Sequence, residues 1–256
     1  MSGRTPLVLM YHGIGDVPAA ADPDNLYVPE AAFAAQLDHL AARGWTVLDE
    51  AGYLAALDGA PTPRRSVLIT FDDGYVSVLE RAAPLLARRG MSAICYVSPG
   101  LDGQAPLPGM PQESRLMTAA QMRELSAAGV ALGCHGWAHE SMPGMSTEQL
   151  EQCTVRARDE LHSLVGERVA TFAYPYGHHD QAAREAVAAA GFACALATYD
   201  GAGRLAIPRV DVNATDTART FELKLSRVYP LARRALGSAP AVRRAAHRVL
   251  GHAARS

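Results

Sequence analysis

Several features that mark specialised classes of protein are scarce or absent in this sequence. The 256 residues include only four cysteines, and none of them shows the C-x-x-C spacing of metal or redox motifs. Residues 1–16 hold an apolar run of only four residues, which is far shorter than a secretory signal or a membrane span. The formal net charge of −2 lacks the positive excess that would favour nucleic acid as a partner. We therefore expect a cytoplasmic protein with reduced, buried thiols.

The sequence has an ordinary globular composition, and its apolar and amphipathic segments alternate as repeating β/α units. Hydrophobic residues make up 49% of the chain and charged residues 20%, which suits one domain of catalytic size. Amphipathic stretches such as 29–44 and 147–166 predict helices between apolar runs of strand length. The expected strands are residues 6–12, 45–49, 66–72, 92–98, 130–135, 169–175, 192–198 and 208–212. Seven or eight parallel strands covered by helices predict a closed or nearly closed barrel, with an open doubly wound sheet as the alternative.

Residues capable of chemistry lie at the C-terminal ends of the expected strands. His12 ends the first strand, Asp72 and Asp73 end the third, His135 ends the fifth, and the segment 174–176 ends the sixth. In a parallel barrel these ends meet at one face, where the active sites of such barrels are found. Asp-Asp-Gly is also a good turn sequence, so the pair of aspartates taken alone has a structural explanation. Their coincidence with the other strand ends favours a site.

Two histidines four residues apart, His135 and His139, add a candidate metal site. The spacing alone is weak evidence, because a structural role explains many such pairs. Together with one aspartate of a neighbouring strand end, the two imidazoles form a two-nitrogen, one-carboxylate set that leaves positions open for water and substrate. The second aspartate is then free to act as a base.

Three motifs in this chain resemble those of a known family. "TFDDGY" (70–75), "HGWAH" (135–139) and "FAYPYG" (172–177) are similar in order and separation to the first three motifs of the polysaccharide deacetylases, the NodB-homology or carbohydrate esterase family four proteins. The resemblance implies a distorted (β/α) barrel that removes acetyl groups from N-acetylated, sometimes O-acetylated, sugars with one divalent metal ion. The barrel domain is expected over residues 1–222.

The resemblance also implies a role for individual residues. Asp73, His135 and His139 would bind the metal, Asp72 would be the general base, and the backbone N–H of Tyr176 would help to hold the oxyanion. A cation beside Asp73 would offset its repulsion of Asp72, so that both carboxylates can be ionised at neutral pH. We expect the metal to be zinc, with cobalt, nickel or manganese as alternatives that depend on which ion is loaded into the site.

This chain departs from the family pattern in two places. The family usually carries an arginine two residues before the proline of the third motif, and Ala173 stands there instead. Arg209 is the candidate to pair with Asp72, with an ordinary surface ion pair as the alternative. The family's late Leu-His pair is also missing, so we favour His12 as the general acid over His178, while Asp72 recycling its own proton is a third option.

Residues 223–256 form a basic, amphipathic C-terminal tail. They contain no Asp or Glu and eight basic residues, which are Lys224, Arg227, Arg233, Arg234, Arg243, Arg244, Arg248 and Arg255. Short basic amphipathic helices can bind an anionic membrane surface, and packing against the barrel is the alternative. Contact with the inner membrane face would suit a lipid-linked glycan substrate.

From these observations we expect a metal-dependent hydrolase that removes acetyl groups from N-acetylated sugars of a polysaccharide or lipid-linked glycan. Two alternatives stay open. One is hydrolysis of another non-peptide C–N bond, such as an imide or formamide, on the same barrel. The other is a non-catalytic carbohydrate-binding relative, which the missing arginine and acid motifs suggest.

Overall fold

The computed structural model describes residues 5–101, 103, 114–199, 201–226 and 229. Its main sheet is parallel throughout and has the strand order β10-β1-β5-β6-β7-β8-β9, with β4 paired beside β5. The strands are β1 (Leu7–Tyr11), β4 (Thr46–Val47), β5 (Ser66–Phe71), β6 (Ala93–Val97), β7 (Val130–Cys134), β8 (Thr171–Ala173), β9 (Cys194–Leu196) and β10 (Val210–Asp211). Each lies within one of the strands expected from the sequence.

The sheet curls until its two edges are joined by one segment, residues 207–211. At its start, Ile207 forms a parallel bridge with Leu196 of β9. At its end, Val210 and Asp211 pair with Leu9 and Met10 of β1. Because a single bridge makes one of these two connections, the result is a distorted (β/α) barrel, as predicted. The open doubly wound alternative is wrong.

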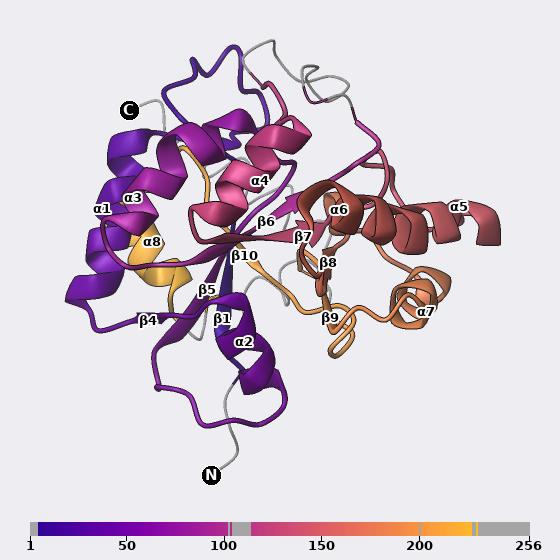
Figure 1. The fold of residues 1–256 in the computed structure, drawn as a ribbon. Helices are drawn as coiled ribbons and strands as arrows, with labels where there is room; N and C mark the ends of the chain where they lie inside the picture. Colours follow the sequence, from indigo (N-terminus) through magenta and orange to yellow (C-terminus); the bar gives the residue numbers. More distant parts are fainter. Residues whose placement is uncertain (1–4, 102, 104–113, 200, 227–228, 230–256) are drawn as a thin grey trace, which may run out of the picture.

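The helices surround the strands, with α1, α3 and α8 on one side of the barrel and α5, α6 and α7 on the other (Figure 1). Their bounds are α1 (Glu30–Ala42), α2 (Glu50–Leu57), α3 (Ala83–Ala87), α4 (Ala119–Ala127), α5 (Thr147–Glu151), α6 (Ala157–Val165), α7 (Gln181–Ala189) and α8 (Ala218–Lys224). The expected helix 29–44 is α1. The expected helix 147–166 runs through α5, a π-helical stretch (Gln152–Arg156) and α6, and it ends at Gly166, whose φ of 76° is left-handed.

Alternating residues of each strand divide the core into an interior and an outer layer. In β6, Ile94 and Tyr96 belong to a cluster inside the barrel, whereas Cys95 and Val97 belong to the layer beneath the helices. This is the period-two pattern of a strand covered on both faces. Tyr53 of α2 also joins the interior cluster, so this helix fills the N-terminal end of the barrel. The opposite, C-terminal end is left for the site.

A second, two-stranded sheet was not expected from the sequence. It pairs β2 (Gly13–Ile14) with β3 (Tyr27–Val28) within the loop that follows β1. The loop is further held by the Asp22 carboxylate, which accepts hydrogen bonds from the N–H groups of Leu26 and Tyr27 at 2.8 Å. These bonds order the chain that leaves His12.

The described residues also bear on two other expectations, the state of the cysteines and the role of the C-terminal tail. All four cysteines are free and buried, as predicted. The tail prediction lies almost entirely outside the described residues, but its first basic residue, Lys224, is buried and its ammonium group lies 2.6 Å from the Asp216 carboxylate. For Lys224 the packing alternative therefore holds. No helix in the described ranges is long and apolar enough to cross a bilayer.

Candidate metal and catalytic site

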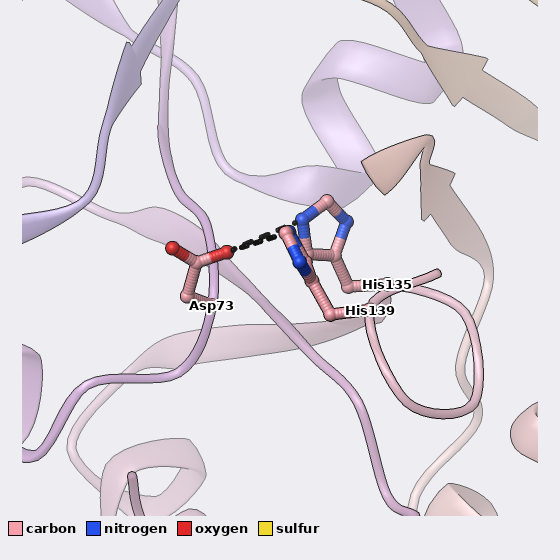
Figure 2. A group of neighbouring side chains, drawn as sticks. All are labelled: Asp73, His135 and His139. Atoms are coloured by element: carbon pink, nitrogen blue, oxygen red, sulfur yellow. Dashed lines mark ion pairs between the residues drawn. The ribbon is translucent and has the colours of Figure 1, made fainter. Parts of the chain in front are cut away.

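The loops after β5 and β7 bring three side chains together at the C-terminal end of the barrel (Figure 2). Asp73 Oδ1 lies 3.5 Å from His135 Nε2 and 3.2 Å from His139 Nε2. The three candidate ligand atoms all lie within 4.8 Å of one another. Both imidazoles thus approach the same carboxylate oxygen, from residues separated by more than sixty positions in the chain.

The backbone of this site is unusual. Among the described residues, four that are not glycine have a positive φ, and three of them are Asp73 (72°), His139 (55°) and Tyr176 (58°). Left-handed backbone is unfavourable for residues with a Cβ atom and is retained mainly where the surrounding structure imposes it, often at functional sites. Each of the three motifs therefore holds one of its residues in a strained, left-handed turn.

The donor set fits a divalent cation. The Nδ1 atom of His135 lies 2.7 Å from the carbonyl oxygen of Ala173, to which it donates, so the neutral ring presents the lone pair of Nε2 to the site. Asp73 Oδ1 is buried and has no hydrogen-bond donor. Buried lone pairs that face one another at this distance need a proton or a cation between them. Two imidazoles and one carboxylate are ligands that zinc prefers.

Asp72 lies next to this cluster and is held by a buried arginine. The Nη1 and Nη2 atoms of Arg209 donate to Asp72 Oδ1 and Oδ2 at 2.6 Å and 2.7 Å. Burial raises the pKa of Asp72, but the charge of Arg209 and its hydrogen bonds to the carboxylate hold the pKa below its usual value. The surface-pair alternative for Arg209 is wrong, because its side chain is fully buried.

Removing the arginine should strongly destabilise the fold. Arg209→Ala leaves the Asp72 carboxylate buried and unpaired, a change that typically costs about 3–5 kcal/mol. We expect a loss of that order in the free energy of unfolding, measured by urea denaturation. The control is Arg43→Ala, which breaks an exposed pair with Glu222 and should cost less than about 1 kcal/mol. Equal losses in the two variants would contradict a buried charge at Asp72.

The remaining predicted residues lie around the same end of the barrel. His12 directly follows β1, is partly exposed, and is close enough for its charge to lower the pKa of both Asp72 and Asp73, although burial of each carboxyl opposes this. The Tyr176 ring is 60% exposed and packs edge-on against His139, with 4.5 Å between ring centroids. His178 is exposed and lies 3.3 Å from the Ser141 hydroxyl.

Sequence reasoning missed the residues that hold Arg209. Its Nε donates to the carbonyl oxygen of Ala197 at 3.1 Å, and its Nη1 also reaches the Thr70 hydroxyl at 3.3 Å. A backbone carbonyl leaves no signal in a sequence. Thr70 lies between the apolar run 67–69 and "FDD", and its polarity there is the one available sign.

Comparison with known proteins identifies the family. The family model described as polysaccharide deacetylase matches residues 59–195, more than half of the chain, and the chain therefore belongs to this family. The matched range contains Asp72, Asp73, His135, His139 and Tyr176 but neither His12 nor Arg209.

The individual relatives agree with this assignment. The Bacillus subtilis (strain 168) protein YxkH, named as a polysaccharide deacetylase, is 26% identical over 221 residues, which cover 84% of this chain and 74% of that protein. Streptococcus pyogenes deacetylase PplD, solved in complex with acetate, shares the fold with a TM-score of 0.78 at 20% identity over 88% of this chain and 100% of that one. IcaB from Ammonifex degensii gives a TM-score of 0.71 at 25% identity, covering 88% and 97%.

Proposed function

We propose that this polysaccharide deacetylase is a metal-dependent enzyme that hydrolyses the N-acetyl group of sugars in a polysaccharide or a lipid-linked glycan. One observation carries the proposal: an Asp-His-His cluster, in which Asp73 and His135 are buried, lies directly beside a carboxylate that a buried arginine holds in its ionised form. The first provides a cation site, and the second provides a base next to it. A cation that polarises the carbonyl group and a base that activates water form one established combination for hydrolysing an unactivated amide.

Asp73, His135 and His139 would hold the metal ion, for which we propose zinc. When bound, it would polarise the acetamide carbonyl group and make water at the site more acidic. The hydrogen bond from His135 Nδ1 to the Ala173 carbonyl oxygen fixes the ring so that Nε2 faces the site. Asp73 keeps one oxygen free of hydrogen bonds for the same purpose.

The other residues would move protons and stabilise charge. Asp72, ionised through its pair with Arg209, would take a proton from the attacking water. The left-handed turn at Tyr176 would place its backbone N–H toward the oxyanion of the tetrahedral intermediate. His12 would give a proton to the departing amine, since an amide anion is too poor a leaving group.

Acetate release is the direct test of this function. Purified protein should contain stoichiometric divalent metal and release acetate from at least one N-acetylated glycan in a panel of oligomers and lipid-linked sugars. Imides and formamides belong in the same panel, because their selective hydrolysis would support a different C–N hydrolase. Bound metal with no turnover of any acylated amine would instead support a non-catalytic carbohydrate-binding protein.

The role of His12 can be tested with leaving groups of different basicity. His12→Ala should bind metal normally but lose about 10²–10⁴-fold in kcat on an unactivated N-acetyl sugar, the usual contribution of a general acid. The loss should be smaller for an activated substrate whose leaving group needs little protonation. His178→Ala is the matched control, because His178 is exposed and bonded to Ser141. A rate unchanged by His12→Ala would remove His12 from the mechanism.

We also propose a cytoplasmic location, with the basic residues that follow Lys224 in the tail 223–256 bringing the enzyme to an anionic membrane surface. The support is the set of four free cysteines, which suits a reducing compartment, and the absence of acidic residues in this part of the sequence.

A further inference from the structure

The guanidinium group of Arg209 lies over an aromatic ring inside the barrel. The central carbon of the group is 5.8 Å from the ring centroid of Tyr96, within the range in which a cation is attracted to the face of an aromatic ring. Tyr96 is fully buried in the interior cluster, so no water competes for the cation on this side. Arg209 therefore has Asp72 on one side and Tyr96 on another.

The Tyr96 ring is itself fixed from the strands around it. Its register partner on β7 is Gly133, and a Cβ atom there would come within 2.3 Å of the ring, so only glycine leaves room for it. Its hydroxyl group donates to the Thr171 hydroxyl at 3.2 Å, which in turn donates to the Glu50 carboxylate at 2.9 Å. The ring is thus anchored at its edge and its tip.

This support matters because Arg209 approaches Asp72 differently from the arginine usual in the family. It comes from the segment that joins the two edges of the sheet, 137 positions after Asp72 in the chain. Ala173, where the family arginine usually stands, belongs to the same interior cluster as Tyr96 and has no group that could pair with Asp72. The ring of Tyr96 borders the guanidinium group in that interior.

We infer that Tyr96 is a positioning residue for the reaction, which holds the Arg209 guanidinium group against Asp72 through its ring face. The inference rests on the proposed function, in which Asp72 is the base. It assigns the effect to the electrons of the ring, whereas the hydroxyl group only anchors the ring to Thr171.

The sharpest test keeps the shape of the aromatic ring at position 96 and changes only the electron density of its face. Tyr96→Phe should retain kcat within about twofold, since the ring face remains. Incorporation of mono-, di- and trifluorinated phenylalanine at position 96 should then lower kcat stepwise, to a total of about tenfold, with KM and metal content unchanged. Because these variants pack alike, a purely structural role would leave kcat independent of fluorine number. That outcome would overturn the inference.

A double-mutant cycle tests whether Tyr96 acts through Arg209. Tyr96→Leu should lower kcat about tenfold in the wild-type background and have no further effect in an Arg209→Gln background. Phe192→Leu serves as the control, because it also removes a buried ring but from the outer core layer, and it should leave kcat unchanged in both backgrounds. Additive losses for Tyr96 and Arg209 would contradict the inference.

A spectroscopic measurement separates this inference from the proposed function. The Nε–H proton of Arg209, which donates to Ala197, should shift in the NMR spectrum with fluorine number at position 96, whatever substrate the enzyme uses. A shift without acetate release from any glycan would retain the role of Tyr96 and reject the proposed substrate. Acetate release with neither a shift nor a kcat trend would support the proposed substrate and reject the role of Tyr96.

Discussion

Asp72→Asn is expected to retain its metal ion and to lose about 10²–10⁴-fold in kcat, the contribution of a positioned general base. Asparagine has nearly the same shape as aspartate but cannot accept a proton from water at neutral pH. The distances support different roles for the two aspartates, with Asp72 as base and Asp73 as metal ligand. Asp72 Oδ2 lies 3.9 Å from His135 Nε2, whereas Asp73 Oδ1 lies 3.5 Å from His135 Nε2 and 3.2 Å from His139 Nε2. Metal content by mass spectrometry and kcat on the same preparation are the measurements.

The neighbouring aspartate provides the reciprocal experiment. Asp73→Asn should lose metal affinity, and its residual activity should recover partly when metal is added in excess. Asp38→Asn, at an exposed carboxylate paired with Arg89, controls for the loss of one charge and should alter neither property. If Asp72→Asn loses metal while Asp73→Asn keeps it, the two roles are reversed.

His135→Ala is expected to abolish stoichiometric metal binding and to reduce acetate release to the uncatalysed level. One of the three proposed protein ligands would be lost, and the buried Asp73 carboxylate would keep only His139 beside it. His139→Ala should behave in the same way, with less effect on folding because the side chain is partly exposed. Isothermal titration with zinc and elemental analysis after dialysis are suitable measurements.

Its control lies in the loop after β8. His178→Ala removes an exposed imidazole that bonds to Ser141 and should leave metal content at the wild-type level. Tight, stoichiometric metal in both His135→Ala and His139→Ala would rule out the cluster as the metal site. Chelation of the wild-type enzyme should mimic the ligand variants and be reversed by added metal.

The strands were predictable because each is an apolar run bounded by Gly, Pro or a polar turn. This pattern also fixed where the strands end, and the C-terminal ends of parallel strands meet in space whatever their separation in sequence. His135 and Asp73 could therefore be placed together without a structure. The same reasoning could not detect the pairing of β2 with β3, whose strands of two residues are too short to show periodicity.

The surroundings of Asp72 were much less predictable. Arg209 stood out only because the expected arginine was absent, and a surface ion pair explained it equally well from the sequence. Tyr96 carried no signal, since an aromatic residue in an apolar strand usually serves only the core. Its contact with Arg209 depends on the curl of the sheet and on Gly133 beside it, and both are properties of the assembled barrel.

The segment that joins the sheet edges also sets the moment at which the enzyme can become active. Until residues 207–211 have left the ribosome and docked between β9 and β1, Asp72 lacks Arg209 and the ring of strands stays open. At about 5–20 residues per second, translation separates the synthesis of Asp72 and Arg209 by roughly seven to thirty seconds. A nascent chain that already contains all three motifs is therefore expected to be inactive. Activity should begin only when residues 207–211 have completed the barrel.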